Sequence, residues 1–256
     1  MILAVDAGNS NIVLGCMEGG KLVSVARMET NRKKTENEYA ATISQILQLD
    51  GKGATDFEGA IISSVVPPLT DTLRIAVRIV TGHESMVVGA GIKTGLNIGL
   101  DDPGTMGADL VTAAVAALSV KRPPLVIIDM GTATTMTVIG VNGRFLGGAI
   151  LPGVGVASDA LTSGASLLPR INIEAPKKCI GANTVDAMKS GAVFGTAGAL
   201  DGMIDRIEAE LGEHVTVMAT GGLANRIIPF CRRQIILDDD LLLKGLWILW
   251  EKNKNR

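Results

Sequence analysis

Two segments of the chain share one order of apolar and polar positions. Each begins with an apolar run that ends in an aspartate, Asp6 in the first segment and Asp129 in the second. Glycine stands two positions after each aspartate, and a second apolar stretch follows it. Gly-Gly at 19–20 and Asn-Gly at 142–143 come next, and both dipeptides are typical of two-residue hairpin turns because they tolerate positive φ. Each half is therefore predicted to open as strand, Asp-x-Gly turn, strand, hairpin and strand.

Helical periodicity accounts for most of the remaining chain. Thr35 and Glu38 have the spacing of a capping box, and apolar residues at helical spacing continue from there to about Leu49. The same reasoning predicts helices at 69–80, 108–120, 155–161, 185–211 and 241–250, and strands at 60–64, 85–88 and 215–219. An alternation of strands and helices of this kind predicts an α/β protein.

The repeated opening, offset by 123 positions, predicts an internal duplication that gives two homologous lobes. Residues 121–124 form the best linker, because Pro123-Pro124 cannot continue a helix. We therefore expect an N-terminal lobe at 1–121 and a C-terminal lobe at 122–256 that includes the terminal helix.

Composition narrows the classes of function. The chain has 256 residues, a net charge of −2 and only 3% aromatic residues, so neither nucleic acid nor a membrane surface is expected as a partner. No apolar run approaches the roughly 20 residues of a membrane span, and the chain opens on a strand-like segment without a basic leader, so we expect a cytoplasmic location. Cys16, Cys179 and Cys231 are expected to be reduced core thiols, because their spacing fits neither a disulfide framework nor a zinc site.

The two Asp-x-Gly turns carry the candidate chemistry. The first, from Asp6 to Ser10, would present main-chain N–H groups to phosphate and a carboxylate to hydrated Mg²⁺. A simple Asx turn at a strand end is an equally good interpretation of this motif alone. The second turn adds hydroxyl groups at Thr132, Thr134 and Thr135, an arrangement expected if two hairpins grip one polyphosphate.

Two further motifs have both a functional and a purely structural interpretation. An apolar strand that ends at Gly221-Gly222 would let the main chain lie against the base of adenosine, although an ordinary strand-to-helix turn also explains it. Asp109 begins a long apolar helix, where a carboxylate is stabilised by the helix dipole even without a catalytic role.

Other motifs are set aside. Residues 15–21 resemble a Walker A loop, but Leu22 stands in place of Ser or Thr and the motif lies across a predicted hairpin, so Lys21 is assigned to a solvated turn. His83 and His214 are expected to be surface residues, because neither has a metal-ligand partner at helical spacing.

Nine short motifs run in order along nearly the whole chain. They are DAGNS at Asp6, TGLNI at Thr94, GAD at Gly107, DMGTATT at Asp129, GGAILPG at Gly147, GANT at Gly181, SGAVFG at Ser190, DGMIDR at Asp201 and ATGGLA at Ala219. Together they resemble the motifs of the type III pantothenate kinases of bacterial coenzyme A synthesis, which belong to the actin, Hsp70 and sugar kinase superfamily.

The resemblance implies two actin-like, ribonuclease H-like lobes with ATP in the cleft between them. It implies that ATP is bound by Asp6, Ala7, Gly8, Asn9, Ser10, Asn11, Ile12, Val13 and Thr132. It assigns pantothenate to Gly107, Ala108, Asp109, Leu110 and Thr184, with Asp109 as catalytic base. A monovalent cation, K⁺ or NH₄⁺, is expected at Asp129, and a homodimer is expected whose interface helps to close the substrate pocket.

The implied reaction is the ATP- and Mg²⁺-dependent phosphorylation of pantothenate to 4'-phosphopantothenate, the first step of coenzyme A biosynthesis. Many relatives have Arg at the position of Leu110 and Tyr near that of Leu100. Without the guanidinium, a charge-assisted bond worth roughly 1.5–3 kcal/mol is missing, and Arg170 is a candidate to replace it. The alternatives are a regulator that binds ATP without turnover and a kinase for another small alcohol.

Overall fold

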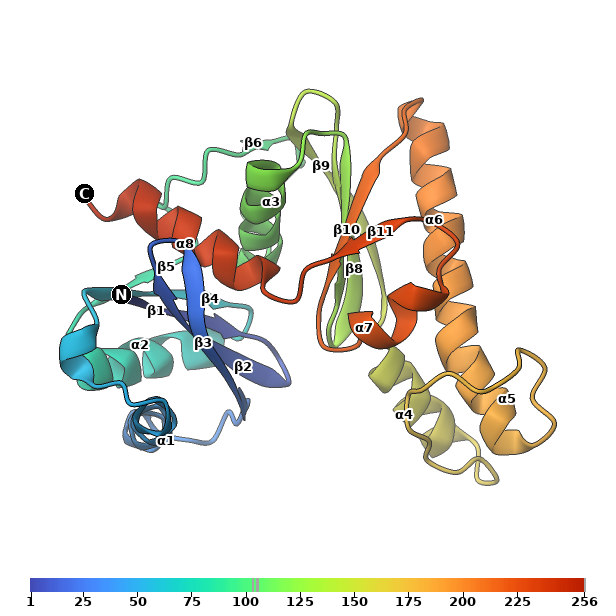
Figure 1. The fold of residues 1–256 in the computed structure, drawn as a ribbon, viewed down its shortest axis with the longest axis horizontal. Coiled ribbons are helices and arrows are strands. Elements are labelled where there is room, and N and C mark those ends of the chain that lie inside the picture. Colours follow the sequence, from blue (N-terminus) through green and yellow to red (C-terminus); the bar gives the residue numbers. More distant parts are fainter. Residues whose placement is uncertain (103, 105, 256) are drawn as a thin grey trace. The chain divides into compact units, whose positions relative to one another are not determined.

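The computed structural model describes residues 1–102, 104 and 106–255. The chain forms two compact units, each built on its own β-sheet (Figure 1). Unit 1 consists of Met1–Leu96, Asp101–Ser119 and Asp240–Arg256, and unit 2 consists of Asn97–Leu100 and Val120–Asp239. The change of unit at 119–120 lies close to the expected linker, whereas the terminal helix belongs to unit 1.

The sheet of unit 1 has five strands. In spatial order they are β3 (Lys21–Glu29), β2 (Asn11–Glu18), β1 (Ile2–Ala7), β4 (Gly59–Ser64) and β5 (Ser85–Val87). The first three are antiparallel neighbours, and β4 and β5 run parallel to β1. Strand β1 is apolar almost throughout because both faces of the sheet are covered.

Helices cover the two faces of this sheet. Leu3 and Val5 of β1 face the core under α1 (Glu36–Leu49) and α2 (Pro67–Thr81). Ile2 and Ala4 face the opposite core, under α3 (Ala108–Val120) and the terminal helix α8 (Leu241–Asn253). A short 3-10 turn, Ala54–Asp56, precedes β4. Because side chains alternate along a strand, Asp6 lies on the face that carries α3.

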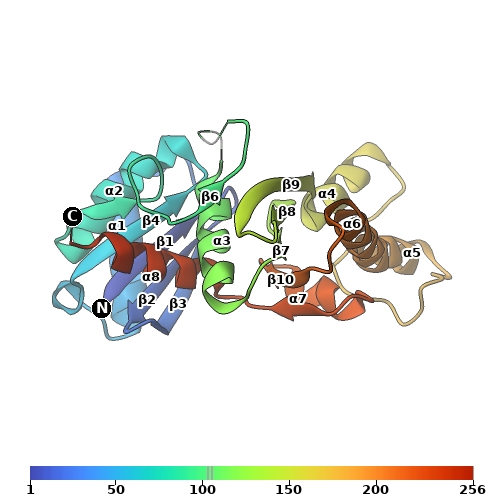
Figure 2. The ribbon, with the colours of Figure 1, turned by 90° about the horizontal axis from the view of Figure 1, so that it is seen from above.

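The terminal helix α8 packs on the first sheet because glycines leave room for its side chains. A Cβ on Gly59 would lie 2.0 Å from the Trp250 ring, and a Cβ on Gly15 would lie 2.8 Å from Leu243 Cδ1. Figure 2 shows α8 lying across this sheet, in contact with β1 and β4. Chain order alone places α8 after the second lobe, and only these contacts between distant residues assign it to unit 1.

The sheet of unit 2 repeats the strand order of unit 1 and adds one strand at its edge. In spatial order the strands are β11 (Ile235–Leu237), β10 (Thr216–Thr220), β7 (Leu125–Met130), β8 (Ala133–Ile139), β9 (Arg144–Pro152) and β6 (Asn97–Ile98). The pairings β7–β8 and β8–β9 are antiparallel, and β10 and β11 run parallel to β7, as β4 and β5 do to β1. The expected α/β class and internal duplication are therefore confirmed.

The helices of unit 2 are α4 (Val154–Gly164), α5 (Thr184–Ser190), α6 (Thr196–Leu211) and α7 (Ala224–Ile227), the last followed by a 3-10 turn, Ile228–Phe230. A π-helical turn, Gly191–Gly195, joins α5 to α6, so the helix predicted at 185–211 is confirmed as a helical segment at 184–211, with a π-helical turn that was not predicted. Glycine at both ends of this turn weakens the α-helical preference there. Leu200 and Ile204 of α6 pack in the core of the second sheet.

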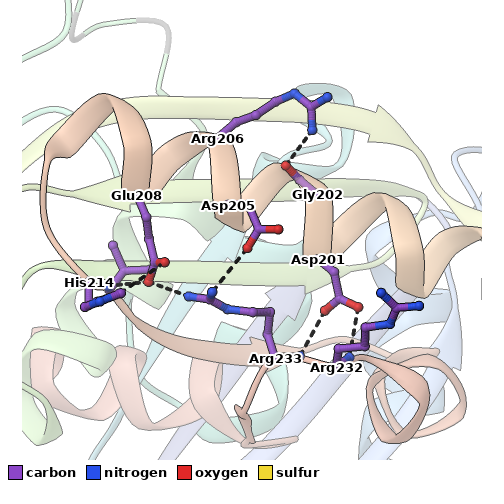
Figure 3. Close-up of polar contacts among 9 residues, drawn as sticks. Asp201, Gly202, Asp205, Arg206, Glu208, His214, Arg232 and Arg233 are labelled. Carbon is purple, nitrogen blue, oxygen red and sulfur yellow. Dashed lines mark hydrogen bonds and ion pairs between the residues drawn. The ribbon is translucent and has the colours of Figure 1, made fainter.

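Acidic side chains along α6 hold the segment that leads into β11 (Figure 3). The Asp201 carboxylate accepts the main-chain N–H groups of Arg232 at 2.8 Å and Arg233 at 3.1 Å. The Arg233 guanidinium then pairs with Asp205 at 3.1 Å and with Glu208 at 2.5 Å. The three carboxylates can act together because they recur at helical spacing on one face of α6.

Several local predictions are confirmed. Glu38 N–H donates to Thr35 Oγ1 at 3.4 Å and Thr35 N–H donates to Glu38 Oε2 at 2.8 Å, which completes the capping box of α1. Helix α3 has the predicted bounds, and β4, β5 and β10 lie within one residue of theirs. His83 and His214 are exposed, and Lys21 is an exposed residue at the start of β3 after the Gly19–Gly20 turn.

Two local predictions are wrong. The second hairpin is not a two-residue turn, because residues 140–143 separate β8 from β9 and Gly140 N–H donates to Arg144 O at 2.9 Å. Cys16 is buried and Cys231 partly buried, but Cys179 is exposed and is therefore no core thiol. Burial raises the pKa of the Cys231 thiol to about 12, with Asp201 adding to the effect. No helix among the described residues is long and apolar enough to cross a membrane.

Candidate active site

The first Asp-x-Gly turn joins β1 to β2 and is partly exposed. Gly8 N–H donates to Asn11 O at 3.0 Å and closes the turn. Thr30, at the start of the segment after β3, braces it from outside: Thr30 Oγ1 donates to Gly8 O at 2.7 Å and Thr30 N–H donates to Ser10 O at 3.0 Å. The turn is therefore held in one shape while Asn9 and Ser10 remain exposed.

The eight residues assigned to ATP in this turn differ in what they can offer a ligand. Asn9, Ser10 and Asn11 are exposed, and Asp6 is partly buried at the end of the strand. Ala7 and Ile12 are fully buried, so only their main-chain atoms are open to a role in binding. Gly8 and Val13 are partly buried.

Asp109 lies in the first turn of α3 and is mostly shielded from water. Its Oδ1 atom accepts the N–H of Leu110 at 2.8 Å. Burial raises the pKa of the Asp109 carboxyl above its ordinary value, although the Leu110 hydrogen bond opposes the shift. A carboxylate in such surroundings is a stronger base than a solvated one.

Asp109 and Asp6 share one edge and one face of the first sheet. Gly107 lies between Asp109 and that edge. A Cβ on Gly107 would lie 2.4 Å from Asp109 Oδ1 and 3.7 Å from Val65 Cγ1, so both side chains approach the same glycine. Val65 follows β4, and its N–H donates to Ala7 O at 3.0 Å. The carboxyl ends of β1 and β4 thus meet beside the start of α3. The preceding Thr105, in the same glycine-rich stretch, lies outside the described residues.

The second Asp-x-Gly turn is shorter and is braced by a different residue. Gly131 N–H donates to Ala133 O at 3.1 Å, and Gly153 N–H donates to Thr132 O at 3.2 Å. A Cβ on Gly153 would lie 2.3 Å from Thr132 O, so glycine is required there. Thr132 is exposed, but Thr134 is buried, so not all three predicted hydroxyls face outward.

The Gly-Gly motif lies directly against the second turn. Thr220 pairs with Asp129 in the parallel β10–β7 ladder. Gly221 has a φ of +100°, and a Cβ there would lie 2.5 Å from Met130 N and 2.6 Å from Asp129 Oδ1. The sequence motifs at 129–132 and 219–224 therefore lie directly against each other in unit 2.

Thr184 is separate from both turns in sequence and lines a pocket of unit 2. It is the first residue of α5, after the N-cap Asn183, which accepts the N–H of Asp186 at 2.9 Å. The pocket measures about 710 Å³ and is also lined by Leu168, Ile171 and Pro152. Pro152 pairs with Ala133, next to Thr132, so the pocket reaches the neighbourhood of the second turn.

The predicted residues are thus grouped in two sets. Unit 1 brings together residues 6–13 and 107–110, and unit 2 brings together Asp129 and Thr132, with the Thr184 pocket nearby. Sequence reasoning missed the bracing residues Thr30 and Gly153. Gly153 carried a signal, since it closes the GGAILPG motif, whereas no local pattern distinguishes Thr30.

Comparison with known proteins identifies the family of the chain. The family model described as type III pantothenate kinase matches residues 2–206. A type III pantothenate kinase of Bacillus cytotoxicus is 44% identical over 253 residues, which cover 99% of this chain and 97% of that protein.

Solved structures share the fold at low sequence identity. An activator of 2-hydroxyisocaproyl-CoA dehydratase from Clostridium difficile, with bound ADPNP, aligns with a TM-score of 0.55 at 13% identity, over 99% of this chain and 96% of that one. An ROK hexokinase from Thermus thermophilus aligns with a TM-score of 0.52 at 12% identity, over 97% of each chain. The two-lobed actin-like fold is therefore confirmed, and the chain belongs to the type III pantothenate kinase family.

Proposed function

We propose that the chain transfers the γ-phosphoryl group of ATP to the primary hydroxyl of pantothenate and forms 4'-phosphopantothenate, the first step of coenzyme A biosynthesis. Membership of the family supports this reaction. The observation that carries the proposal is the position of Asp109. Its carboxyl is shielded from water, has a raised pKa and shares an edge of the first sheet with the Asp6 turn.

ATP is proposed to take its phosphate ligands from both Asp-x-Gly turns. In unit 1 these are residues 6–13, whose turn offers the exposed polar groups of Asn9, Ser10 and Asn11. In unit 2 the exposed Thr132 supplies a hydroxyl. ADPNP in the Clostridium difficile activator, which has this fold, supports an adenine nucleotide as the ligand.

Asp109 is proposed to act as the general base. Leu110 N–H holds Oδ1, so Oδ2 is assigned to receive the proton of the pantothenate hydroxyl. The hydroxyl oxygen then forms its bond to the γ-phosphorus as the bond to the ADP oxygen breaks, and ADP leaves. A raised pKa favours this proton transfer because it brings the base closer to neutral pH.

The carboxylates fit the cations that such a reaction uses. Mg²⁺ is usually held by one or two carboxylates together with phosphate oxygens, and Asp6 is proposed to contribute in this way. No group of three His, Cys, Asp or Glu side chains forms a closed metal site within the described part of the chain. Asp129 is the proposed ligand of the monovalent cation, K⁺ or NH₄⁺, through its carboxylate, whose Oδ1 atom lies close to the main chain of Gly221. When bound, these cations neutralise charge on the phosphates.

Pantothenate is assigned to residues 107–110 and to Thr184. Leu110 is partly buried and cannot pair with the pantothenate carboxylate. Arg170 is the proposed replacement, because it is exposed between Leu168 and Ile171, which both line the Thr184 pocket. We expect Arg170→Ala to raise the KM for pantothenate and to leave the KM for ATP unchanged.

A homodimer is proposed from the apolar surface of unit 2. Leu167 is 92% exposed, Ile180 is 88% exposed and Ile150 is 77% exposed. Leu167 and Ile180 adjoin in sequence the pocket residues Leu168 and Gly181, and large exposed apolar patches often mark interfaces. A second copy that covers them would also narrow the Thr184 pocket. We also propose that the reaction takes place in the cytoplasm, where ATP and Mg²⁺ are abundant.

The test is ADP release from Mg-ATP with pantothenate, with glucose or with no acceptor, in K⁺ and in Na⁺ buffers. We expect release that requires pantothenate, is faster in K⁺ and is lost in Asp109→Asn. Tight ATP binding without pantothenate-dependent release would instead favour an ATP-binding regulator, and release with glucose would favour a kinase for another alcohol.

A further inference from the structure

Arg32 contacts the first Asp-x-Gly turn from a segment that no motif includes. Its Nη2 atom donates to Asn9 Oδ1 at 2.9 Å. Both side chains are exposed, and Arg32 makes no ion pair with any carboxylate among the described residues. A guanidinium that stands beside a proposed phosphate turn and has no acidic partner is suited to bind an anion.

The position of Arg32 is fixed by its own segment. The Tyr39 hydroxyl, buried at the start of α1, donates to Asn31 O at 2.9 Å and accepts Asn31 N–H at 2.9 Å. On the other side of Asn31, Thr30 makes its two hydrogen bonds to the turn. The main chain next to Arg32 is therefore tied both to the helix and to the turn.

The chemistry of the guanidinium favours a polyphosphate as its ligand. It carries five N–H donors in a planar fork. One goes to Asn9, so others remain for phosphate oxygens near the turn. We infer that Arg32 binds the β- and γ-phosphates of the nucleotide and is anchored for this by Asn9. This inference rests on the proposed assignment of residues 6–13 to ATP.

The experiment measures binding of Mg-ATP, Mg-ADP and AMP by calorimetry. Arg32→Ala removes charge and anchor, Arg32→Lys keeps the charge, and Arg32→Gln keeps an amide donor for Asn9 without the charge. Lys33→Ala is the matched control, because Lys33 is the adjacent exposed cation and its side chain makes no hydrogen bond to the turn.

We expect Arg32→Ala and Arg32→Gln to weaken Mg-ATP binding about tenfold, as for loss of one charge-assisted bond at an exposed site. Arg32→Lys should lose less Mg-ATP affinity, and Lys33→Ala should change that affinity less than twofold. The affinity for AMP should not change in any of these variants. In turnover, the KM for ATP should rise while the KM for pantothenate stays constant. Thermal unfolding of each variant, compared with Lys33→Ala, reports whether the fold is retained.

Two results would overturn the inference. Wild-type affinity in Arg32→Gln would mean that Arg32 only orients Asn9, and equal affinities in Arg32→Ala and Lys33→Ala would mean that it has no specific contact. Asp6→Ala separates these results from failure of the proposed ATP turn. If Asp6→Ala also binds Mg-ATP normally, the turn itself is wrongly assigned; if Asp6→Ala loses binding, only the role of Arg32 fails.

Discussion

Gly221 and Asp129 lie so close that no other residue fits at position 221. A Cβ there would come within 2.6 Å of the Asp129 Oδ1 atom and 2.5 Å of Met130 N, and the φ of Gly221 is +100°. The glycine that follows β10 and the aspartate near the end of β7 therefore constrain each other's position. Two motifs separated by about ninety residues in the sequence form a single structural feature.

Gly221→Ala is expected to disrupt this feature. The methyl group would strain the left-handed main chain and displace the Asp129 carboxylate, so the free energy of unfolding should fall by roughly 2 kcal/mol or more. Chemical denaturation measures the loss, and turnover should fall with it. Gly164→Ala is the control, since that position has open space around it. Wild-type stability in Gly221→Ala would contradict the close approach.

Gly245→Ala tests the packing that positions α3. Alanine normally stabilises a helix by about 1 kcal/mol relative to glycine. At position 245 of α8, however, a Cβ would lie 2.1 Å from Thr112 O of α3. We therefore expect a loss of about 1–3 kcal/mol in denaturation experiments, together with lower turnover because α3 carries Asp109. Gly198→Ala in α6, where nothing is close, should be neutral or stabilising.

Asp109→Asn is expected to make the protein more stable at neutral pH. Burial raises the pKa of Asp109 in the folded state above its unfolded value. The stability that the carboxyl group contributes is therefore fully present below its unfolded pKa. This stability is lost as the pH rises through the folded pKa. Asparagine does not ionise, so the variant keeps this stability at neutral pH. Since 1 kcal/mol corresponds to roughly 2–4 °C for a protein of this size, the Tm should rise by a few degrees.

The pH dependence separates this effect from a change in packing. The Tm difference between Asp109→Asn and wild type should be largest at pH 8 and should disappear below about pH 3, where the unfolded carboxyl is protonated. A difference that is constant over this range would contradict the assignment of a raised pKa. Asp71→Asn, at a highly exposed position, should show no comparable gain at pH 8.

Glu208 is expected to show the opposite dependence. Its burial is outweighed by hydrogen bonds from Val215 N–H, Arg233 and His214, which lower the pKa of Glu208. A lowered folded pKa contributes stability above the unfolded value, and that stability is lost as the pH falls through the folded pKa. Glu208→Gln should therefore destabilise the protein at pH 7 by about 1–3 kcal/mol and hardly at all at the acid limit.

Glu210→Gln provides the matched control for this prediction, because Glu210 is exposed on the same helix and makes no contact with Arg233. Equal stability losses in the two variants at pH 7, measured by urea denaturation, would show that the Glu208 hydrogen bonds contribute nothing specific.

Local sequence signals were sufficient to predict the helices and strands that neighbouring residues determine. The capping box at Thr35 and Glu38 predicted the start of α1, and apolar periodicity predicted α3. The two Asp-x-Gly motifs predicted that both halves open with the same succession of strand, turn and strand along the chain, since each combines a buried strand with a turn that glycine favours. The residues of each motif lie where strands end, which is why the candidate site could be proposed at all.

Features that depend on distant residues could not be predicted in this way. The place of α8 depends on the absence of a side chain at Gly59, which leaves room for Trp250. The two-residue strand β6 exists only because Asn97 and Ile98 pair with the distant strand β9. Arg32 adjoins Asn9 through the path of the chain after β3, and no periodicity encodes that contact.

Pantothenate phosphorylation with Asp109 as the base is tested most directly by ³¹P NMR of Mg-ATP and pantothenate mixed with the wild-type protein and, in parallel, with Asp109→Asn. We expect a phosphomonoester signal of 4'-phosphopantothenate to grow in step with ADP in the wild type, and at least about 100-fold more slowly in Asp109→Asn. Formation of ADP without that signal, or equal rates in the two proteins, would contradict this expectation.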